Sequence, residues 1–238
     1  MLYVIPTPIG NLEDISLRAS RILSEVDFIL VEDTRISGKL LKHLNISTKM
    51  VAFHAHNEHH QLQKVLEELQ SGANIGLISD AGSPGISDPG FLLIRACREA
   101  EIEVTCLPGP NAVTTAVITS GIPCDKFFFE GFLPHKKGRR TRLEFLSDLQ
   151  ETFVLFESPH RLLKCLKELN QYCGIDRKAA VCRELTKLYE EVKYGHLESL
   201  YTYFKEEGKC KGEIVIIIDG KRGLKSTEKT KKSLTPKG

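Results

Sequence analysis

The stretch that decides the fold is residues 76–90, which reads GLISDAGSPGISDPG. The apolar run that leads into it predicts a buried strand over 74–79, and an apolar helical pattern resumes at Phe91. The loop between them is longer and richer in glycine than a turn requires. In open α/β sheets ligands bind at the carboxyl ends of the strands, where this loop would lie. We therefore predict a loop that binds a ligand through its backbone.

The end of this loop has a second interpretation. Asp88 followed by Pro89 is typical of a helix start, with Asp88 as the N-cap and Pro89 at the first helical position. This interpretation accounts for the last residues of the loop but not for its length. Both interpretations stay open for these two residues.

The chain has 238 residues, of which 41% are hydrophobic, and this suits one large or two small domains. The N-terminal MLYVI meets Pro6 without a preceding basic segment, so we expect no signal peptide. The longest aliphatic run, Ile214 to Ile218, is too short to span a bilayer. We expect a soluble, cytoplasmic protein with no membrane partner.

The seven cysteines are scattered and form no C-x-x-C pair. This spacing supports neither a disulfide framework nor a zinc site, so we expect reduced and mostly buried thiols. Charge is concentrated at the C-terminal end, where residues 221–238 carry seven Lys or Arg against one Glu. This segment predicts a separate, disordered basic tail, which serves either solubility or contact with nucleic acid.

The periodicity of the chain predicts two α/β domains. Strands at 2–5, 28–31, 49–53, 74–79 and 102–107 alternate with helical patterns, which indicates a mainly parallel sheet in an N-terminal domain of residues 1–118. Strands at 127–132, 152–156, 179–183, 189–194 and 213–219 indicate a C-terminal domain of residues 119–220, with a mixed sheet richer in antiparallel pairs.

Two clusters of polar residues follow predicted strands. Glu32, Asp33 and Arg35 come directly after the second strand and are candidates for a catalytic site, although Asp33 or Thr34 could equally cap a helix. The segment His54–His60 holds four of the eight histidines. It lacks the H-E-x-x-H register, so we predict no metal site there and expect substrate contact or surface polarity instead.

A third cluster is basic. The segment Pro134–Arg142 reads PHKKGRRTR and contains Lys136, Lys137, Arg139, Arg140 and Arg142. Such a cluster suits a polyanionic partner such as RNA. The alternative is a solvated surface loop.

Five segments together resemble the ribosomal RNA small-subunit methyltransferase I group of the tetrapyrrole (corrin and porphyrin) methylase superfamily. They are VIPTPIGNLEDISLRA, EDTR, SDAGSPGISDPG, PGPNAVTTAVITSGIP and VLFESPHRL. ELTKLYEE and KGEIVIII also fit, so the resemblance spans residues 2–218. It implies two α/β domains with S-adenosylmethionine in the cleft between them, and a homodimer.

The resemblance also implies cofactor contacts, made mostly by backbone groups. Carried over by motif, they fall on Pro8, Ala81, Gly82, Ser83, Ile86, Asn111, Ala112, Glu157 and Leu185. To these we add Asp80, whose carboxylate suits a sulfonium cation. Ser83 and Glu157 depart from the residues usual in the small-molecule methylases, and this favours the ribosomal RNA group.

The activity implied is 2′-O-methylation of a cytidine ribose in the decoding centre of small-subunit (16S) rRNA. The substrate would be an assembled or nearly assembled small subunit. Glu32, Asp33 and Arg35 are then the catalytic candidates, and His160 and Arg161 could join the basic cluster in holding phosphates. Two alternatives stay open: methylation of a tetrapyrrole or another small molecule, and a catalytically silent RNA-binding protein of ribosome assembly.

Overall fold

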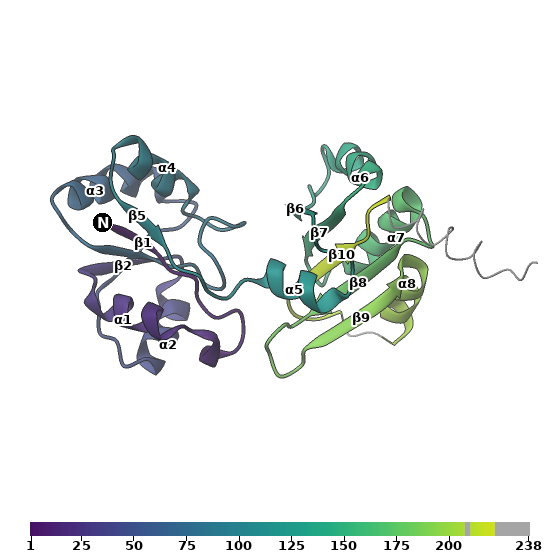
Figure 1. Cartoon of the computed structure of the whole chain (residues 1–238), viewed down its shortest axis with the longest axis horizontal. Helices are drawn as coiled ribbons and strands as arrows, with labels where there is room; N and C mark the ends of the chain where they lie inside the picture. The colour runs from purple at the N-terminus through teal and green to yellow at the C-terminus, as the bar shows by residue number, and fades with distance from the viewer. Residues whose placement is uncertain (208–209, 222–238) are drawn as a thin grey trace, which may run out of the picture. The chain divides into compact units, whose positions relative to one another are not determined.

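The computed structural model describes residues 1–207 and 210–221 and consists of two units (Figure 1). The first unit is Met1–Asn111 and the second begins at Ala112. Helix α5 (Ala112–Ser120) belongs to the second unit because it packs on strands of that unit, whereas the sequence places the boundary after residue 118. Apart from Lys221, the expected basic tail lies outside the described residues.

The N-terminal unit is built on a parallel sheet with the strand order β3-β2-β4-β1-β5. The strands are β1 (Leu2–Val4), β2 (Phe28–Val31), β3 (Met50–Ala52), β4 (Ile75–Leu77) and β5 (Val104–Cys106). Helices cover both faces of this sheet, which is why its central strands are apolar throughout. The mainly parallel sheet predicted for this part of the chain is confirmed.

Two pairs of helices enclose the sheet of the N-terminal unit. One face packs on α1 (Leu17–Glu25) and α2 (Thr34–His43), and the other on α3 (Glu58–Gln70) and α4 (Phe91–Glu99) (Figure 1). A short 3₁₀ helix (Leu12–Asp14) precedes α1. Helix α1 begins after Ser16, whose side chain accepts a hydrogen bond from the Ala19 N–H, as expected of an N-cap.

The start of α4 differs from one interpretation of the sequence. Its N-cap is Gly90 and not Asp88, so the assignment of Asp88 as N-cap is wrong. Gly90 has φ +124°, which only glycine adopts readily, and a Cβ built there would lie 2.9 Å from Cδ2 of Leu77. The requirement for glycine therefore comes from the strand beneath the loop, which the local sequence does not reveal.

The C-terminal unit has a mixed sheet with the strand order β6-β7-β10-β8-β9. The strands are β6 (Phe127–Phe132), β7 (Thr152–Glu157), β8 (Lys178–Arg183), β9 (Glu191–His196) and β10 (Ile214–Ile218). β6 pairs with β7 in parallel, whereas the pairs β7–β10, β10–β8 and β8–β9 are antiparallel. The predicted fold class, with its mixed second sheet, is confirmed.

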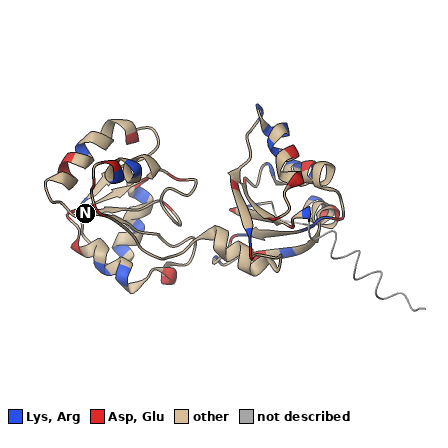
Figure 2. Cartoon of the chain, turned by 45° about the horizontal axis from the view of Figure 1, so that its top comes forward, with Lys and Arg blue, Asp and Glu red and all other residues tan. Residues whose placement is uncertain are grey.

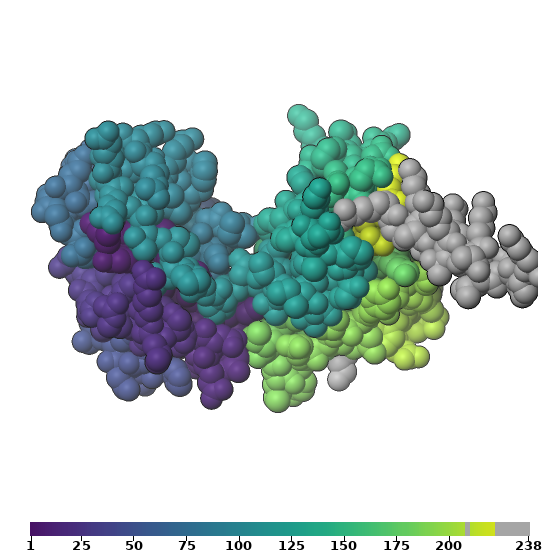
Figure 3. Space-filling model, viewed as in Figure 1, coloured from purple at the N-terminus to yellow at the C-terminus, as the bar shows by residue number. Residues whose placement is uncertain are grey.

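Helices again cover the C-terminal sheet. The largest core forms where α6 (Arg139–Asp148), α7 (Leu162–Cys173) and α8 (Leu197–Glu206) pack on one face of the sheet. α5 packs on β8, β9 and β10, where Cys182 Sγ faces the Ala116 carbonyl. Figure 3 shows the surface of each unit in space-filling form, coloured by residue number.

The cysteines follow the expectation of mostly buried, free thiols. Cys97, Cys165, Cys173 and Cys182 are buried, and none of the seven forms a disulfide among the described residues. Burial raises the pKa of Cys97 and of Cys173 to about 11 and that of Cys182 to about 12, which suppresses the reactive thiolate. Across the described part of the chain, every helix is too short or too polar to cross a membrane.

Candidate active site

The functional residues of the N-terminal unit gather at the carboxyl edge of its sheet. All strand pairs there are parallel, so the residues that follow the strands emerge at one edge. Thr7 lies beyond β1, Glu32 follows β2, His54 lies beyond β3 and Asp80 beyond β4. The topology therefore brings together acids and loops that lie far apart in the sequence.

The loop after β4 is tied to the loop after β1. Thr7 and Gly82 form an isolated bridge in which each N–H donates to the other carbonyl at 2.9 Å. The Thr7 hydroxyl donates to the Ser79 carbonyl at 3.0 Å, and both side chains are buried. Gly82 has φ +80°, so the bridge requires a residue that tolerates the left-handed region. This tie places buried Pro8 beside the candidate cofactor loop.

Two further hydrogen bonds fix the rest of this loop. Glu58, a buried carboxylate at the start of α3, accepts a hydrogen bond from the Gly90 N–H at 3.2 Å. The Asn111 amide donates to the Ser83 hydroxyl at 3.1 Å, so two residues predicted to bind the cofactor touch each other. Ile86, near the middle of the loop, is exposed. Hydrogen bonds thus hold the loop at several points, while Ile86 near its middle is exposed to solvent.

Asp33 and Arg35 form a pair at the start of α2. Asp33 caps the helix by accepting from the Arg35 N–H at 2.8 Å, and Arg35 Nη2 donates to Asp33 Oδ2 at 2.5 Å. These contacts with Arg35 lower the pKa of Asp33 to about 2. The helix-cap alternative is therefore correct for Asp33. A carboxylate with so low a pKa is also a weak proton acceptor.

Glu32 and Asp80 are in a different electrostatic state. Burial, followed by the neighbouring Asp80, raises the pKa of Glu32. Burial also raises the pKa of Asp80. The hydrogen bond that Asp80 Oδ1 accepts from the Asp33 N–H at 3.1 Å acts in the opposite direction and lowers it, but burial has the larger effect. Both carboxyl groups are only partly withdrawn from solvent. Two carboxylates with raised pKa at neighbouring strand ends are suited to accept a proton or to face a cation.

The histidine segment begins at the same edge. Asn57 Oδ1 accepts from the His54 N–H at 2.7 Å, and its amide donates to the Ala52 carbonyl at 3.0 Å. The His54 and His56 rings meet edge to face with centroids 6.0 Å apart. Within the described residues, no group of His, Cys, Asp and Glu is placed to hold a metal ion. His54 is instead an electrostatic neighbour of Glu32, and its charge acts to lower the pKa of that carboxyl.

In the C-terminal unit, Glu157 ends β7 inside a buried network. Its Oε1 accepts from the Ser158 N–H at 2.8 Å and lies 2.8 Å from Nη2 of Arg161. Its Oε2 lies 3.7 Å from Nη2 of Arg139, which in turn pairs with Glu168 at 2.7 Å. Within the described part of the chain, Glu157 Oε2 and the Arg161 Nε and Nη1 have no hydrogen-bond partner. Such open positions in a buried group suit a polar ligand or water.

Leu185 lies just beyond β8, in a strained loop. Glu184 has φ +53° and Thr186 has φ +65°, so residues other than glycine occupy the left-handed region on both sides of Leu185. Glu184 holds the turn by accepting from the Glu213 N–H at 2.9 Å. Because Glu157 and Arg183 both pair with Ile214, this loop and Glu157 share one edge of the sheet. Strain of this kind is concentrated at ligand-binding positions.

The basic cluster separates into two groups. Lys136, Lys137, Arg140 and His160 are exposed. Arg139, Arg142 and Arg161 are instead bound to Glu168, Glu130 and Glu157 respectively. Figure 2 shows basic residues at the start of α6 and acidic residues further along it. The structure therefore brings the predicted RNA-contacting residues together on one part of the unit but ties some of them to internal carboxylates.

Some residues that shape these sites were not anticipated from the sequence. Thr7 and Glu58 hold the loop after β4, and Glu168 holds Arg139. Their partners lie far away along the chain, so no local pattern could identify them. For Glu168 the sequence does contain one signal. Lys164 and Glu168 are four residues apart on an amphipathic helix, so both lie on the same face of that helix.

The residues present fit a methyl donor that carries a sulfonium cation. Glu32 and Asp80 provide negative charge beside a glycine-rich loop, and Gly82 permits close approach of the backbone. In the C-terminal unit, considered by itself, Glu157 and Arg161 keep buried polar atoms without a hydrogen-bond partner among the described residues. When bound, S-adenosylmethionine supplies an electrophilic methyl group.

Comparison with known proteins gives one family. The model of the tetrapyrrole (corrin/porphyrin) methylases matches residues 1–201. A protein of Vibrio cholerae named ribosomal RNA small subunit methyltransferase I is 47% identical over 93% of this chain and 78% of its own length. A protein of Synechocystis sp. with the same name is also 47% identical, over 92% of this chain and 79% of its own length.

Solved structures show the same fold at low sequence identity. Diphthine synthase superposes with a TM-score of 0.71 and 14% identity, covering 92% of this chain and 89% of that one. Cobalt precorrin-4 methyltransferase superposes with a TM-score of 0.66 and 18% identity, covering 92% and 94%. The chain belongs to the tetrapyrrole methylase family and is a methyltransferase that uses S-adenosylmethionine.

Proposed function

We propose that this chain methylates the ribose 2′-oxygen of a cytidine in the decoding centre of small-subunit rRNA. The observation that carries the proposal is the 47% identity, over 93% of the chain, to a protein named for the small-subunit rRNA. The cobalt precorrin-4 methyltransferase structure is only 18% identical and supports the fold alone. The substrate would be an assembled or nearly assembled small ribosomal subunit, which places the reaction in the cytoplasm.

Glu32 is the proton acceptor in this proposal. A ribose hydroxyl is a poor nucleophile at neutral pH, so its proton must move to a base as the new O–C bond forms and the S–C bond breaks. Glu32 suits this role because burial and Asp80 raise its pKa, whereas the pKa of Asp33 is about 2. Asp33 and Arg35 then fix the backbone next to Glu32, and Arg35, with its side chain 87% exposed, can reach a phosphate.

The remaining contacts are assigned by unit. For the cofactor we propose Pro8, Asp80, Ala81, Gly82, Ser83, Ile86 and Asn111 in the first unit, and Ala112, Glu157 and Leu185 in the second. For RNA we propose the exposed Lys136, Lys137, Arg140 and His160. We also propose Arg139, Arg142 and Arg161, which are held in place by ion pairs with Glu168, Glu130 and Glu157 respectively.

We further propose a homodimer. The C-terminal unit exposes large apolar side chains on α5, on β9 and in the loop between β8 and β9. These are Ile118, Leu188, Tyr189 and Tyr194. Apolar groups left in water on several neighbouring elements are typical of a surface that another protein covers. Sedimentation of the purified protein tests this part of the proposal.

The decisive experiment is methyl transfer from labelled cofactor to isolated small ribosomal subunits, followed by mapping of the label. We expect one labelled cytidine whose 3′ phosphodiester resists alkali, because a methylated 2′-oxygen cannot attack the adjacent phosphate. Label on the base, with normal cleavage at that position, would overturn ribose methylation. Binding of cofactor without transfer to any subunit preparation would favour the silent RNA-binding alternative.

A further inference from the structure

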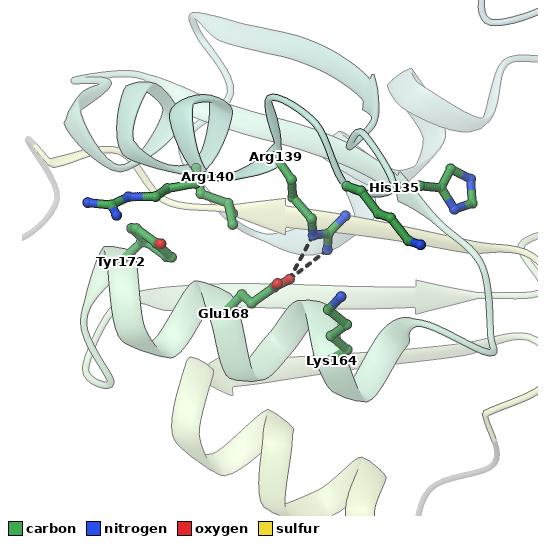
Figure 4. Close-up of a pocket in the computed structure, with 8 residues that line it drawn as sticks. His135, Arg139, Arg140, Lys164, Glu168 and Tyr172 are labelled. Atoms are coloured by element: carbon green, nitrogen blue, oxygen red, sulfur yellow. Dashed lines mark hydrogen bonds and ion pairs between the residues drawn. The ribbon is translucent and has the colours of Figure 1, made fainter.

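A basic pocket of about 260 Å³ lies between α6 and α7 in the C-terminal unit (Figure 4). Its lining residues are His135, Lys136, Arg139, Arg140, Leu143, Lys164, Glu168 and Tyr172. Four of these side chains are cationic and only Glu168 is anionic. Lys164 and Tyr172 come from α7, an element that the basic sequence cluster does not include. The pocket is therefore a different feature from that cluster, although the two share residues.

Arg139 forms a fixed part of the pocket wall. It reaches from the start of α6 to α7, where Nε and Nη2 donate to Glu168 at 2.9 and 2.7 Å (Figure 4). Nη1 donates to the Pro134 carbonyl at 3.1 Å, and the side chain is 7% exposed. These three bonds use three of the five N–H groups of the guanidinium, and Nη2 also lies 3.7 Å from Oε2 of Glu157, so carboxylates already surround Arg139 and the lysines must provide the direct contacts to an anion. The positive charge is thus held in place before any ligand arrives.

The lysines of the pocket provide charge that the protein itself does not neutralise. In the described part of the chain, neither Lys136 nor Lys164 has a carboxylate oxygen within 4.0 Å of its ammonium, whereas Arg140 pairs with Glu144. Lys164 extends toward the Arg139–Glu168 pair from one turn earlier on α7 (Figure 4). Two unpaired ammonium groups beside a held guanidinium attract a compact anion with several acceptor oxygens, such as a phosphate.

We infer that this pocket holds one backbone phosphate of the RNA substrate, with Lys164 and Lys136 as its direct contacts and Arg139 as the residue that positions the charge. The inference rests on the proposed function for the identity of the RNA. The volume is below that of usual small-molecule sites and suits a phosphate with part of its sugar. Leu143 and Tyr172 provide the apolar wall for the sugar, and exposed Lys137 continues the cationic path beyond the pocket.

The test compares two lysines of the same helix. Lys164→Ala removes a pocket cation, whereas Lys167→Ala removes an exposed cation that does not line the pocket. Binding of the full-length variants to small ribosomal subunits is measured from low to high salt. Lys164→Ala should reduce the slope of log affinity against log salt by about 0.7 to 0.9, the value of one phosphate contact, and Lys164→Arg should restore it. Lys167→Ala should leave the slope unchanged.

Each outcome has a separate meaning. Equal slopes for Lys164→Ala and Lys167→Ala would overturn the pocket as an RNA contact, even if methyl transfer by the wild-type protein proceeds. Wild-type binding with the expected slope change, but no methyl transfer, would refute the proposed function and support the pocket. If inorganic phosphate binds the wild-type protein by calorimetry while both variants bind subunits alike, the pocket serves a free anion and the inference is wrong. A wild-type protein that does not bind subunits would refute both.

Discussion

The strand-end edge of the N-terminal unit and the α6–α7 region of the C-terminal unit both bring acids and arginines together, but they neutralise them differently. At the strand-end edge the ion pair Asp33–Arg35 is exposed, and Glu32 and Asp80 beside it have raised pKa values and, among the described residues, no arginine within ion-pair distance. Between α6 and α7, Glu168 forms an ion pair with buried Arg139. Lys136 and Lys164 of the same pocket have no ion-pair partner among the described residues. The first arrangement leaves carboxylates available for chemistry, whereas the second leaves cations available for binding.

The largest effect expected from this contrast is on catalysis. Glu32→Gln should lower the rate of methyl transfer by about 10²- to 10⁴-fold, the usual contribution of a general base, with little change in cofactor or RNA affinity. Single-turnover transfer to small subunits measures the rate. Because the carboxylate must be ionised to accept a proton, the wild-type rate should fall as the pH drops through the raised pKa of Glu32.

The matched variant is Asp33→Asn, which preserves the helix cap because asparagine is also a good N-cap. It should transfer methyl groups at a rate much closer to that of the wild type. If the two amide variants were equally slow, the distinction between Glu32 and Asp33 would be wrong.

The next effect is on stability. Arg139→Ala removes the only ion-pair partner that the described residues give Glu168 and weakens the surroundings of Glu157, whose side chain is fully buried. Among the described residues, the variant leaves Glu168 without an ion pair and Glu157 with Arg161 alone, and because the Glu168 side chain is 22% exposed the loss should be about 1 to 3 kcal/mol of the free energy of unfolding. Urea unfolding provides the measurement. Arg140→Ala is the control on the same helix, since its pair with Glu144 is exposed, and it should change the stability little. Similar losses in both variants would contradict the structural role of Arg139.

The smallest effect concerns the exposed pair. The pKa of Asp33 is about 2, below its ordinary value of 3.8, so its ionised form stabilises the folded state above pH 3.8 and this contribution is lost as the pH falls toward 2. Wild type should therefore be slightly more stable than Asp33→Asn at neutral pH, and the difference should shrink as the pH falls through 2. Thermal unfolding over this pH range provides the test. A difference that did not shrink between neutral pH and pH 2 would assign the effect to the hydrogen bond and not to the charge.

The parts of the fold that could be predicted are those whose local sequence pattern reflects their burial. β2 was predicted with its observed bounds because a strand covered on both faces is apolar throughout. α6 was not predicted, since its sequence RRTRLEFLSD resembles a solvated basic segment. It is a helix because Leu143 and Leu146 reach the core and because Arg139 finds an acid 29 residues later. Partners so distant leave no local pattern.

The candidate site shows the same division. The loop after β4 was predicted to bind a ligand from its own glycines and prolines, and the structure adds that Thr7, Glu58 and Asn111 hold it in place. The sequence located the acids Glu32, Asp33 and Asp80, but it could not rank them by their ability to accept a proton. Their ranking depends on Arg35 turning back onto Asp33 and on the burial of Glu32 beside Asp80. These are properties of the assembled edge and not of the segment EDTR.

The bridge between Thr7 and Gly82 has a consequence for hydrogen exchange. Each N–H donates to the other carbonyl, so neither amide can be released while the other stays bonded in its native geometry. The two amide hydrogens should therefore exchange with solvent deuterium in a single opening event, although 75 positions of sequence separate them. That opening would detach the loop after β4 from the loop after β1 in one step. Protection of these two amides thus reports the free energy of opening the loop after β4.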